Sequence, residues 1–329
     1  EDPPSSRQVT PSRDPRLERG RPSAVGDAGR RAVPPAAAPV RRGARERVIF
    51  SGGNRNFVRH NESQRFFNAG ARRQARPDGG SIASVRRRNG TVYSEFDRNG
   101  RLIRRYRVQP DGRRFVLIDN RRFYRRGVGI ALGLGAAAVV LAPLAYANYQ
   151  NYIVEYEDAD YRQLVYALDE DPVATIPRRY SLEEILSSVS LRERMRRIDI
   201  ATLRFVEGTA RIGSREHRKL RQLARVMSEI IRENPDEVFL IEGHAFDDGS
   251  GEDPLELSDQ RAEEVAKILS EEFGIPPENL VTQGYGDEFV GRGTRGRYPT
   301  RISVRRITPL LEQGSLQGPD DGGQEQPPY

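Results

Sequence analysis

LIEGHAFDDGSGEDPLELSDQRAEEV, residues 240–265, joins three local signals in one segment. A short apolar run precedes an acidic, glycine-rich loop, and a run with apolar residues at helical spacing follows the loop. Ser258 can cap this helix and Gly274 can end it, so the spacing predicts a helix over 258–273. We therefore expect a strand, a loop and a helix in direct succession.

The pattern around this segment predicts one domain over residues 198–309. Strands are expected near 198–205, 238–241, 279–283 and 301–307, and another helix over 214–234. The order β-α-β-α-β-β, with the helices on one face, predicts an α/β (α+β) two-layer sandwich. Residues 152–197 are expected to form a helical connector, in which Ser181 and Glu184 fit a capping box.

The N-terminal half has a different character. Residues 1–47 are rich in Pro and Arg and predict a disordered linker. Residues 48–124 predict an Arg-rich antiparallel β-meander, because Asx-Gly turns separate β-prone runs. Such a sheet has little apolar area and is expected to be marginal alone. The last segment, 310–329, predicts a disordered tail.

Residues 127–147 form an apolar segment without a single charged residue. The segment is long enough to cross a bilayer, so it predicts a transmembrane helix. Arginines precede it and tyrosines follow it, and the positive-inside rule would then place residues 1–126 in the cytoplasm and the rest outside. The alternative is an apolar connector that lies against a partner or a folded core.

Charge is unevenly divided along the chain. Residues 1–126 hold 31 arginines against 12 acidic residues, whereas acidic residues are in excess over 127–329. A basic half suggests a polyanionic partner, such as anionic lipid, an acidic glycan or nucleic acid, and the alternative is a solvated basic tail. Nucleic acid is disfavoured because no recognisable binding motif interleaves aromatic residues with the arginines. The absence of cysteine excludes disulfides and thiolate chemistry.

A set of spaced residues within 198–309 forms an extended motif. Its members are Gly243, His244, Gly249, Ser250, Leu257, Ser258, Arg261, Ala262, Val265, Gly284, Tyr285, Gly286 and Arg301. In these residues the segment resembles the OmpA-like C-terminal domain, the peptidoglycan-binding module of bacterial cell-envelope proteins. The pattern of that family is G-H-T-D-x-x-G-S, then N-x-x-L-S-x-x-R-A-x-x-V, then G-x-G, then N-R-R-V.

The resemblance implies recognition of the peptide stem of peptidoglycan. An arginine can fork onto the free carboxylate of diaminopimelate, and an aspartate can pair with its ammonium group. Arg261 stands at the family's arginine, but Phe246 stands at the family's aspartate and Ala245 at the preceding threonine. Asp247 or Asp248 could substitute if the loop shifts. Further polar positions of the family's pattern are replaced by Pro254, Pro299 and Thr300.

Two functions follow from these residues. The first is a non-enzymatic, membrane-associated protein of the bacterial cell envelope, whose periplasmic OmpA-like domain anchors to peptidoglycan. The second is a structural or protein-interaction module with a degenerate site, in which exposed Phe246 meets a protein partner. No catalytic constellation, cofactor or metal site is predicted, since the acidic loop lacks calcium-ligand spacing. The candidate peptidoglycan-binding residues are Ala245, Phe246, Asp247, Asp248, Gly249, Ser258, Arg261 and Arg301.

Overall fold

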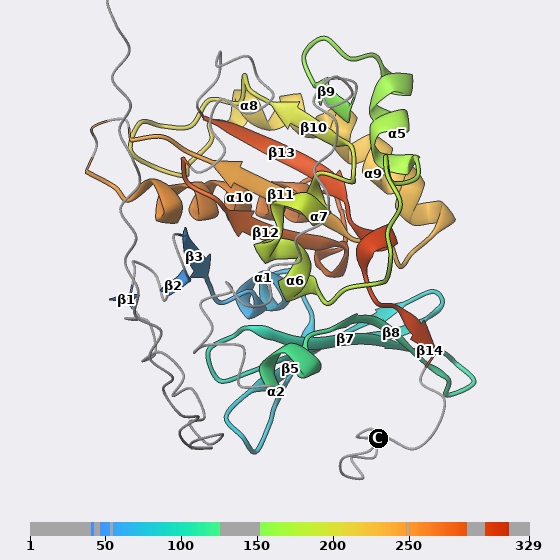
Figure 1. Ribbon diagram of the computed structural model, residues 1–329. Coiled ribbons are helices and arrows are strands. Elements are labelled where there is room, and N and C mark those ends of the chain that lie inside the picture. Colours follow the sequence, from blue (N-terminus) through green and yellow to red (C-terminus); the bar gives the residue numbers. More distant parts are fainter. Residues whose placement is uncertain are drawn as a thin grey trace, which may run out of the picture. The chain divides into compact units, whose positions relative to one another are not determined.

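A five-stranded sheet forms the centre of the domain predicted at 198–309 (Figure 1). The computed structural model describes residues 41–42, 47–52, 55–125, 152–247, 249, 251–287 and 300–315. The strand order is β12-β11-β13-β10-β9, with β11 parallel to β12 and antiparallel to β13. The strands are β9 (Ile153–Glu155), β10 (Arg197–Ile200), β11 (Phe239–His244), β12 (Leu280–Gly284) and β13 (Arg301–Arg306). The sequence pattern did not predict β9, a short strand parallel to β10.

Helices cover one face of this sheet and confirm the predicted β-α-β-α-β-β order. Apolar side chains of the helices pack with Ile198, Ile241 and Val304 in one core. The elements on this side are α5 (Tyr161–Asp169), α8 (Ser214–His217), η2 (Arg218–Leu220), α9 (Arg221–Glu233) and α10 (Pro254–Glu271), and the short turns η3 (Pro277–Asn279) and η4 (Thr308–Leu310) flank the last two strands.

The helix α10 begins four residues before the predicted start at Ser258. Asp253 is its N-cap, and the carboxylate accepts the backbone N–H of Leu255 at 2.9 Å. Pro254 takes the first helical position, where its missing N–H costs nothing. The predicted start was wrong because a serine inside the helix was read as the cap.

The second face of the sheet is also covered. Two short helices, α6 (Leu182–Ser187) and α7 (Val189–Arg192), lie on this side (Figure 1), and Ser181 and Glu184 make the predicted capping box of α6. Leu240 and Val281 point to this face and belong to a second hydrophobic core. Further elements therefore pack on the second face of the sheet, outside the predicted two-layer sandwich.

The Arg-rich half also contributes to this second core. Its larger sheet has the order β14-β8-β7-β6-β5-β4, the up-and-down arrangement that the turns predicted. The elements of this half are β1 (Arg41–Arg42), β2 (Val48–Gly52), β3 (Arg55–Arg59), α1 (Ser63–Asn68), β4 (Arg72–Ala75), β5 (Ser81–Arg87), β6 (Gly90–Phe96), β7 (Leu102–Val108), β8 (Arg114–Asp119) and α2 (Arg121–Arg125), joined by β14 (Gly314–Ser315) from the end of the chain.

Structure therefore extends into two segments that were predicted to be disordered. Arg41 and Arg42 pair with β2, and residues 314–315 pair with β8. The rest of the predicted linker, apart from Arg47, and the tail from residue 316 lie outside the described residues.

One hydrophobic core joins the segments on either side of residues 127–147. Phe66, Phe96 and Leu102 from the first segment pack in the same cluster as Leu182 and Val281 from the second. A bilayer cannot pass through a shared core, so the prediction that placed the two segments on opposite sides of a membrane is wrong. The apolar segment 127–147 itself lies outside the described residues, and none of the helices in the described ranges is long and apolar enough to cross a membrane.

Two glycines of the strand ends let α10 approach the sheet closely. A methyl group on Gly243 would lie 1.9 Å from the carbonyl oxygen of Ser258, and one on Gly284 would lie 2.4 Å from the backbone nitrogen of Asp259. Both contacts are with helix backbone, which cannot move aside without moving α10. These two positions therefore require glycine for packing.

We expect Gly284→Ala to lower the free energy of unfolding by about 2–3 kcal/mol, because the added methyl overpacks the helix against the sheet. The matched control is Gly213→Ala, whose new methyl would meet no atom within 4 Å and should change stability by at most about 0.5 kcal/mol. Urea unfolding followed by circular dichroism measures both. Equal stabilities of the two variants would contradict the close-packing argument.

Candidate functional site

Two of the candidate residues hold the loop and helix in place. Ala245 is fully buried, and its N–H donates to the carbonyl oxygen of Gly286 at 3.1 Å. The Ser258 hydroxyl donates to the carbonyl of Leu255 at 2.8 Å and accepts the N–H of Gly286 at 2.9 Å. Both residues therefore fix the geometry between the strand ends and the first turns of α10, from inside the domain.

The loop after β11 presents other candidates to solvent. Phe246 is 50% exposed, an unusual environment for a large apolar side chain. Asp247 Oδ1 accepts the N–H of Gly249 at 3.0 Å, so this carboxylate closes the turn of its own loop. Gly249 has φ of +79°, a backbone conformation that favours glycine. Asp248 lies outside the described residues.

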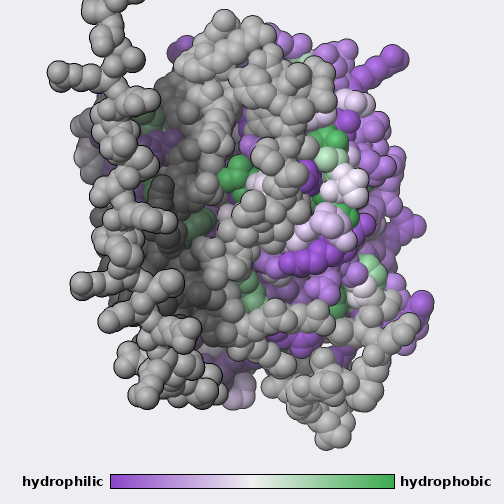
Figure 2. Space-filling view, in the orientation of Figure 1, coloured by the Kyte–Doolittle hydropathy of each residue, from purple (hydrophilic) through white to green (hydrophobic). Residues whose placement is uncertain are grey.

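Few apolar side chains are exposed among the described residues that Figure 2 shows. Where that view shows described residues, the surface is mostly hydrophilic and the apolar side chains form small separate patches (Figure 2). Phe246 is one of three large hydrophobic residues of the described ranges that are exposed, with Tyr166 and Val206. Its exposure is therefore a specific feature of the loop.

Arg261 projects from α10 towards the turn at residues 205–212. Its Nε donates to the carbonyl oxygen of Thr209 at 3.1 Å, and its guanidinium carbon lies 4.8 Å from the ring centroid of Phe205. The residue is buried. A carbonyl and an aromatic ring thus hold the guanidinium in a fixed orientation. The side chain therefore loses less conformational entropy when it binds a carboxylate.

Arg301 does not join Arg261. It lies on the strand face away from α10 and is buried, with its Nε 3.6 Å from Asp199 Oδ2. The same layer contains Glu242, which pairs with Arg192 at 2.9 Å and with Arg305 at 3.1 Å. This layer is an ionic part of the protein interior, and Arg301 belongs to it.

His244 is also part of this buried layer. Burial and the nearby Arg301 charge lower its pKa to about 4, against a smaller opposing effect of Glu242. The imidazole is therefore neutral at neutral pH, and it stacks on Tyr285 with ring centroids 5.8 Å apart. Its place in the interior agrees with a structural role.

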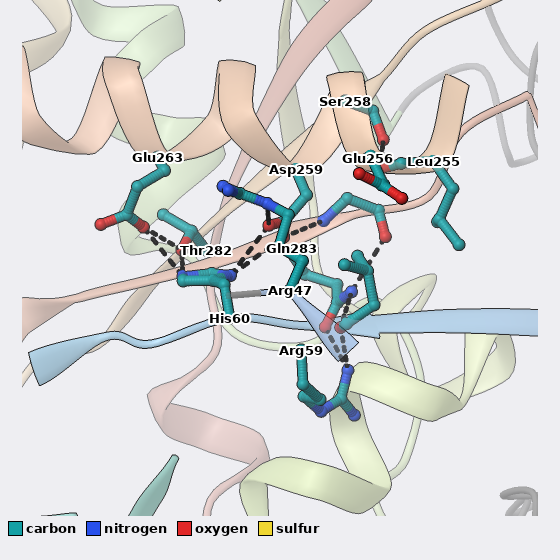
Figure 3. A network of polar contacts seen from close by, with 12 residues as sticks. Arg47, Arg59, His60, Leu255, Glu256, Ser258, Asp259, Glu263, Thr282 and Gln283 are labelled. Atoms are coloured by element: carbon teal, nitrogen blue, oxygen red, sulfur yellow. Dashed lines mark hydrogen bonds and ion pairs between the residues drawn. The ribbon is translucent and has the colours of Figure 1, made fainter. Parts of the chain in front are cut away.

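A second polar cluster, missed by the sequence analysis, joins the Arg-rich half to α10 (Figure 3). His60, which follows β3, lies between two acids of the helix: its Nδ1 is 2.9 Å from Asp259 Oδ2, and its Nε2 is 3.0 Å from Glu263 Oε2. Arg47 Nε donates to Asp259 at 2.8 Å, and Arg65 pairs with Glu263 at 2.7 Å. We call these five residues the His60 cluster.

The His60 cluster is a charged network. Burial alone would lower the pKa of His60, but Asp259 and Glu263 outweigh that effect and raise its pKa to about 10. Burial would raise the pKa of Asp259, whereas His60 and Arg47 lower it below its usual value. The imidazolium and both carboxylates are therefore charged at neutral pH and stabilise one another.

Further arginines of the first half pair with acids of the second. Arg59 contacts Glu183 at 2.5 Å, Arg87 contacts Glu278 at 2.5 Å, and Arg107 contacts Asp236. The charge difference between the halves is thus partly neutralised inside the chain. That difference was the signal that could have revealed the contact, but the sequence analysis considered only an external polyanion or a solvated basic tail.

Comparison with known proteins agrees with the resemblance found in the sequence. A model of the OmpA family matches residues 204–297. A search of curated proteins found no match. Within the described residues, no group of three or more His, Asp or Glu side chains could hold a metal ion.

Solved structures with some similarity are bacterial envelope domains. The periplasmic domain of Helicobacter pylori MotB is 19% identical with a TM-score of 0.27, over 32% of this chain and 69% of that one. An outer membrane protein of Borrelia burgdorferi B31 is 21% identical with a TM-score of 0.25, over 35% and 87%. The OmpA-like domain of FopA1 from Francisella tularensis is 19% identical with a TM-score of 0.26, over 36% and 71%. These scores are too low to add an argument. The family model and its motif therefore identify residues 204–297 as a domain that matches the OmpA family.

Proposed function

We propose that this chain is a non-enzymatic protein of the bacterial cell envelope whose OmpA domain contacts peptidoglycan in the periplasm. The observation that carries the proposal is the orientation of Arg261, which the carbonyl of Thr209 and the ring of Phe205 hold in place. The frame around it keeps the family's close packing, since Gly243, Gly284 and Ser258 support the loop and helix.

In this proposal Arg261 takes a carboxylate of the peptide stem. A guanidinium binds a carboxylate through two parallel hydrogen bonds, and an already oriented side chain loses little freedom on binding. The ammonium group of the same ligand has no partner at the family's aspartate position, which is Phe246. We therefore expect binding that is roughly ten- to a hundredfold weaker than a complete site would give.

The exposure of Phe246 favours a second function, contact with another envelope protein. An aromatic side chain that is half exposed at a loop tip can anchor a protein interface. In that case the OmpA domain would be a structural or interaction module with a degenerate peptidoglycan site.

A pull-down with purified peptidoglycan sacculi separates these functions. The full chain must be used, because the OmpA domain alone would expose the core that it shares with the Arg-rich half. We expect the wild type to pellet with sacculi and Arg261→Ala to bind at least about tenfold more weakly, since a charge-assisted pair is lost. Phe246→Asp should bind more tightly than the wild type, because it restores an acid for the ammonium group.

The matched control is Arg215→Ala, which removes an exposed arginine of α8. It should pellet like the wild type, and circular dichroism checks that each variant is folded. A wild type that stays in the supernatant would refute peptidoglycan binding and leave protein contact through Phe246 as the function.

A further inference from the structure

A cleft of about 670 Å³ lies between α10 and the Arg-rich half, next to the turn that holds Arg261. The link between them is Thr209, because its carbonyl accepts from Arg261 and the residue also lines the cleft. Four residues of the His60 cluster form part of its wall, namely Arg47, His60, Arg65 and Glu263. The cleft is therefore built from both halves of the chain, whereas the family motif covers only one of them.

Two charged side chains at the rim of the cleft have no ion-pair partner among the described residues. Glu264 and Lys267 stand one helical turn apart on α10, yet within the described ranges neither makes an ion pair with the other or with any other residue. Four amide side chains, one further cation and one further acid also line the cleft. These residues are Asn61, Gln64, Asn68, Gln260, Arg211 and Glu252.

Such a rim can bind a ligand that carries both a positive and a negative charge. A carboxylate of the protein pairs with an ammonium, Lys and Arg pair with carboxylates, and side-chain amides bond to peptide groups. Apart from the charged imidazole of His60, the lining has no ring and no large aliphatic side chain, so an apolar ligand would gain little by entering. A short zwitterionic peptide meets each of these conditions.

We propose that this cleft binds a zwitterionic peptide stem, with Glu264 taking its ammonium group and Lys267 a carboxylate. The inference rests on the proposed function, since a peptidoglycan stem would reach the cleft from Arg261 along the turn at Thr209. Glu264, on α10, then supplies the acidic group that the loop lacks because Phe246 stands at the family's aspartate position. The Arg-rich half contributes Gln64 and Asn68 and so becomes part of the binding site.

The test is calorimetric titration of the full chain with a purified peptidoglycan stem peptide that contains diaminopimelate. We expect the wild type to bind and Glu264→Gln and Lys267→Gln each to weaken binding by about tenfold, because each loses a charged partner. The control Glu271→Gln, on the same helix but outside the cleft and exposed, should bind like the wild type.

The variants separate the two proposals. If Glu264→Gln and Lys267→Gln bind like the wild type while Arg261→Ala does not, the cleft is overturned and the role of Arg261 stands. If both cleft variants bind more weakly and Arg261→Ala is unaffected, the cleft stands and the role of Arg261 is overturned. A wild type that does not bind the free peptide overturns the cleft, and the sacculus pull-down still decides the proposed function.

Discussion

Replacing Asp259 with asparagine is expected to lower the free energy of unfolding by about 3–5 kcal/mol, because the buried charges of Arg47 and His60 would each lose an anionic partner. Asp259 is fully buried, and both cations lie within 2.9 Å of it. Its Oδ1 also accepts the N–H of Gly284 at 3.2 Å, so the substitution disturbs the packing of α10 on β12 as well. Urea unfolding at pH 7 gives the value.

The same substitution should change how stability depends on pH. The pKa of His60 is about 10 in the folded chain and about 6.5 in an unfolded one, so the folded chain holds the proton more tightly. Its contribution is complete below about pH 6.5 and is lost as pH rises towards 10, with a slope of at most about 1.4 kcal/mol per pH unit. In Asp259→Asn the imidazolium has lost one anion, so this loss should be smaller.

The control for this prediction is Asp158→Asn, at an exposed position whose side chain makes no hydrogen bond or ion pair with a described residue. It should change stability by at most about 0.5 kcal/mol and keep the wild-type pH dependence. A stability of Asp259→Asn within that same range would show that the His60 cluster does not hold the two halves together.

The second large effect concerns the location of the two halves. Single cysteines at Gln74, on exposed strand β4, and at Glu207, in an exposed turn of the OmpA domain, are expected to be in one compartment. The chain has no native cysteine, so each variant carries one thiol. A membrane-impermeant maleimide applied to intact cells should label both or neither, because residues on both sides of 127–147 share one core.

Labelling after the membranes have been permeabilised is the control, and there both thiols should react fully. Labelling of one thiol alone in intact cells would mean that the two segments lie on opposite sides of a membrane, which contradicts their common core. Unlike a stability change, this result is all or none.

The sequence was sufficient to predict those elements of the fold that depend on local residue patterns. Apolar periodicity located α9 and α10, Asx-Gly turns located the meander, and Ser181 with Glu184 marked the start of α6. Arg301 was placed at a candidate site because motif spacing does not tell which face of a strand a side chain occupies. The structure puts it in the buried ionic layer, on the other side of the sheet from Arg261.

Contacts between distant segments could not be predicted in this way. His60 and Asp259 are about 200 residues apart, and no periodicity in one segment refers to the other. Net charge indicated that the halves attract some partner, but not that each is the other's partner. The sequence therefore placed every candidate residue in the OmpA domain, whereas the cleft beside Arg261 is lined by residues of both halves.

The pairing of β14 with β8 has a consequence for biosynthesis. Gly314 aligns with Val116, and Leu310 and Leu311 enter the core that contains Phe96. The N-terminal sheet therefore gains its last strand only after about 200 further residues have been made, a delay of roughly 10–40 s at usual rates of translation. During that interval the nascent chain exposes an apolar surface and an unpaired strand edge, both of which promote aggregation. The first half can therefore complete its sheet and bury this core only once residues 310–315 have been synthesised.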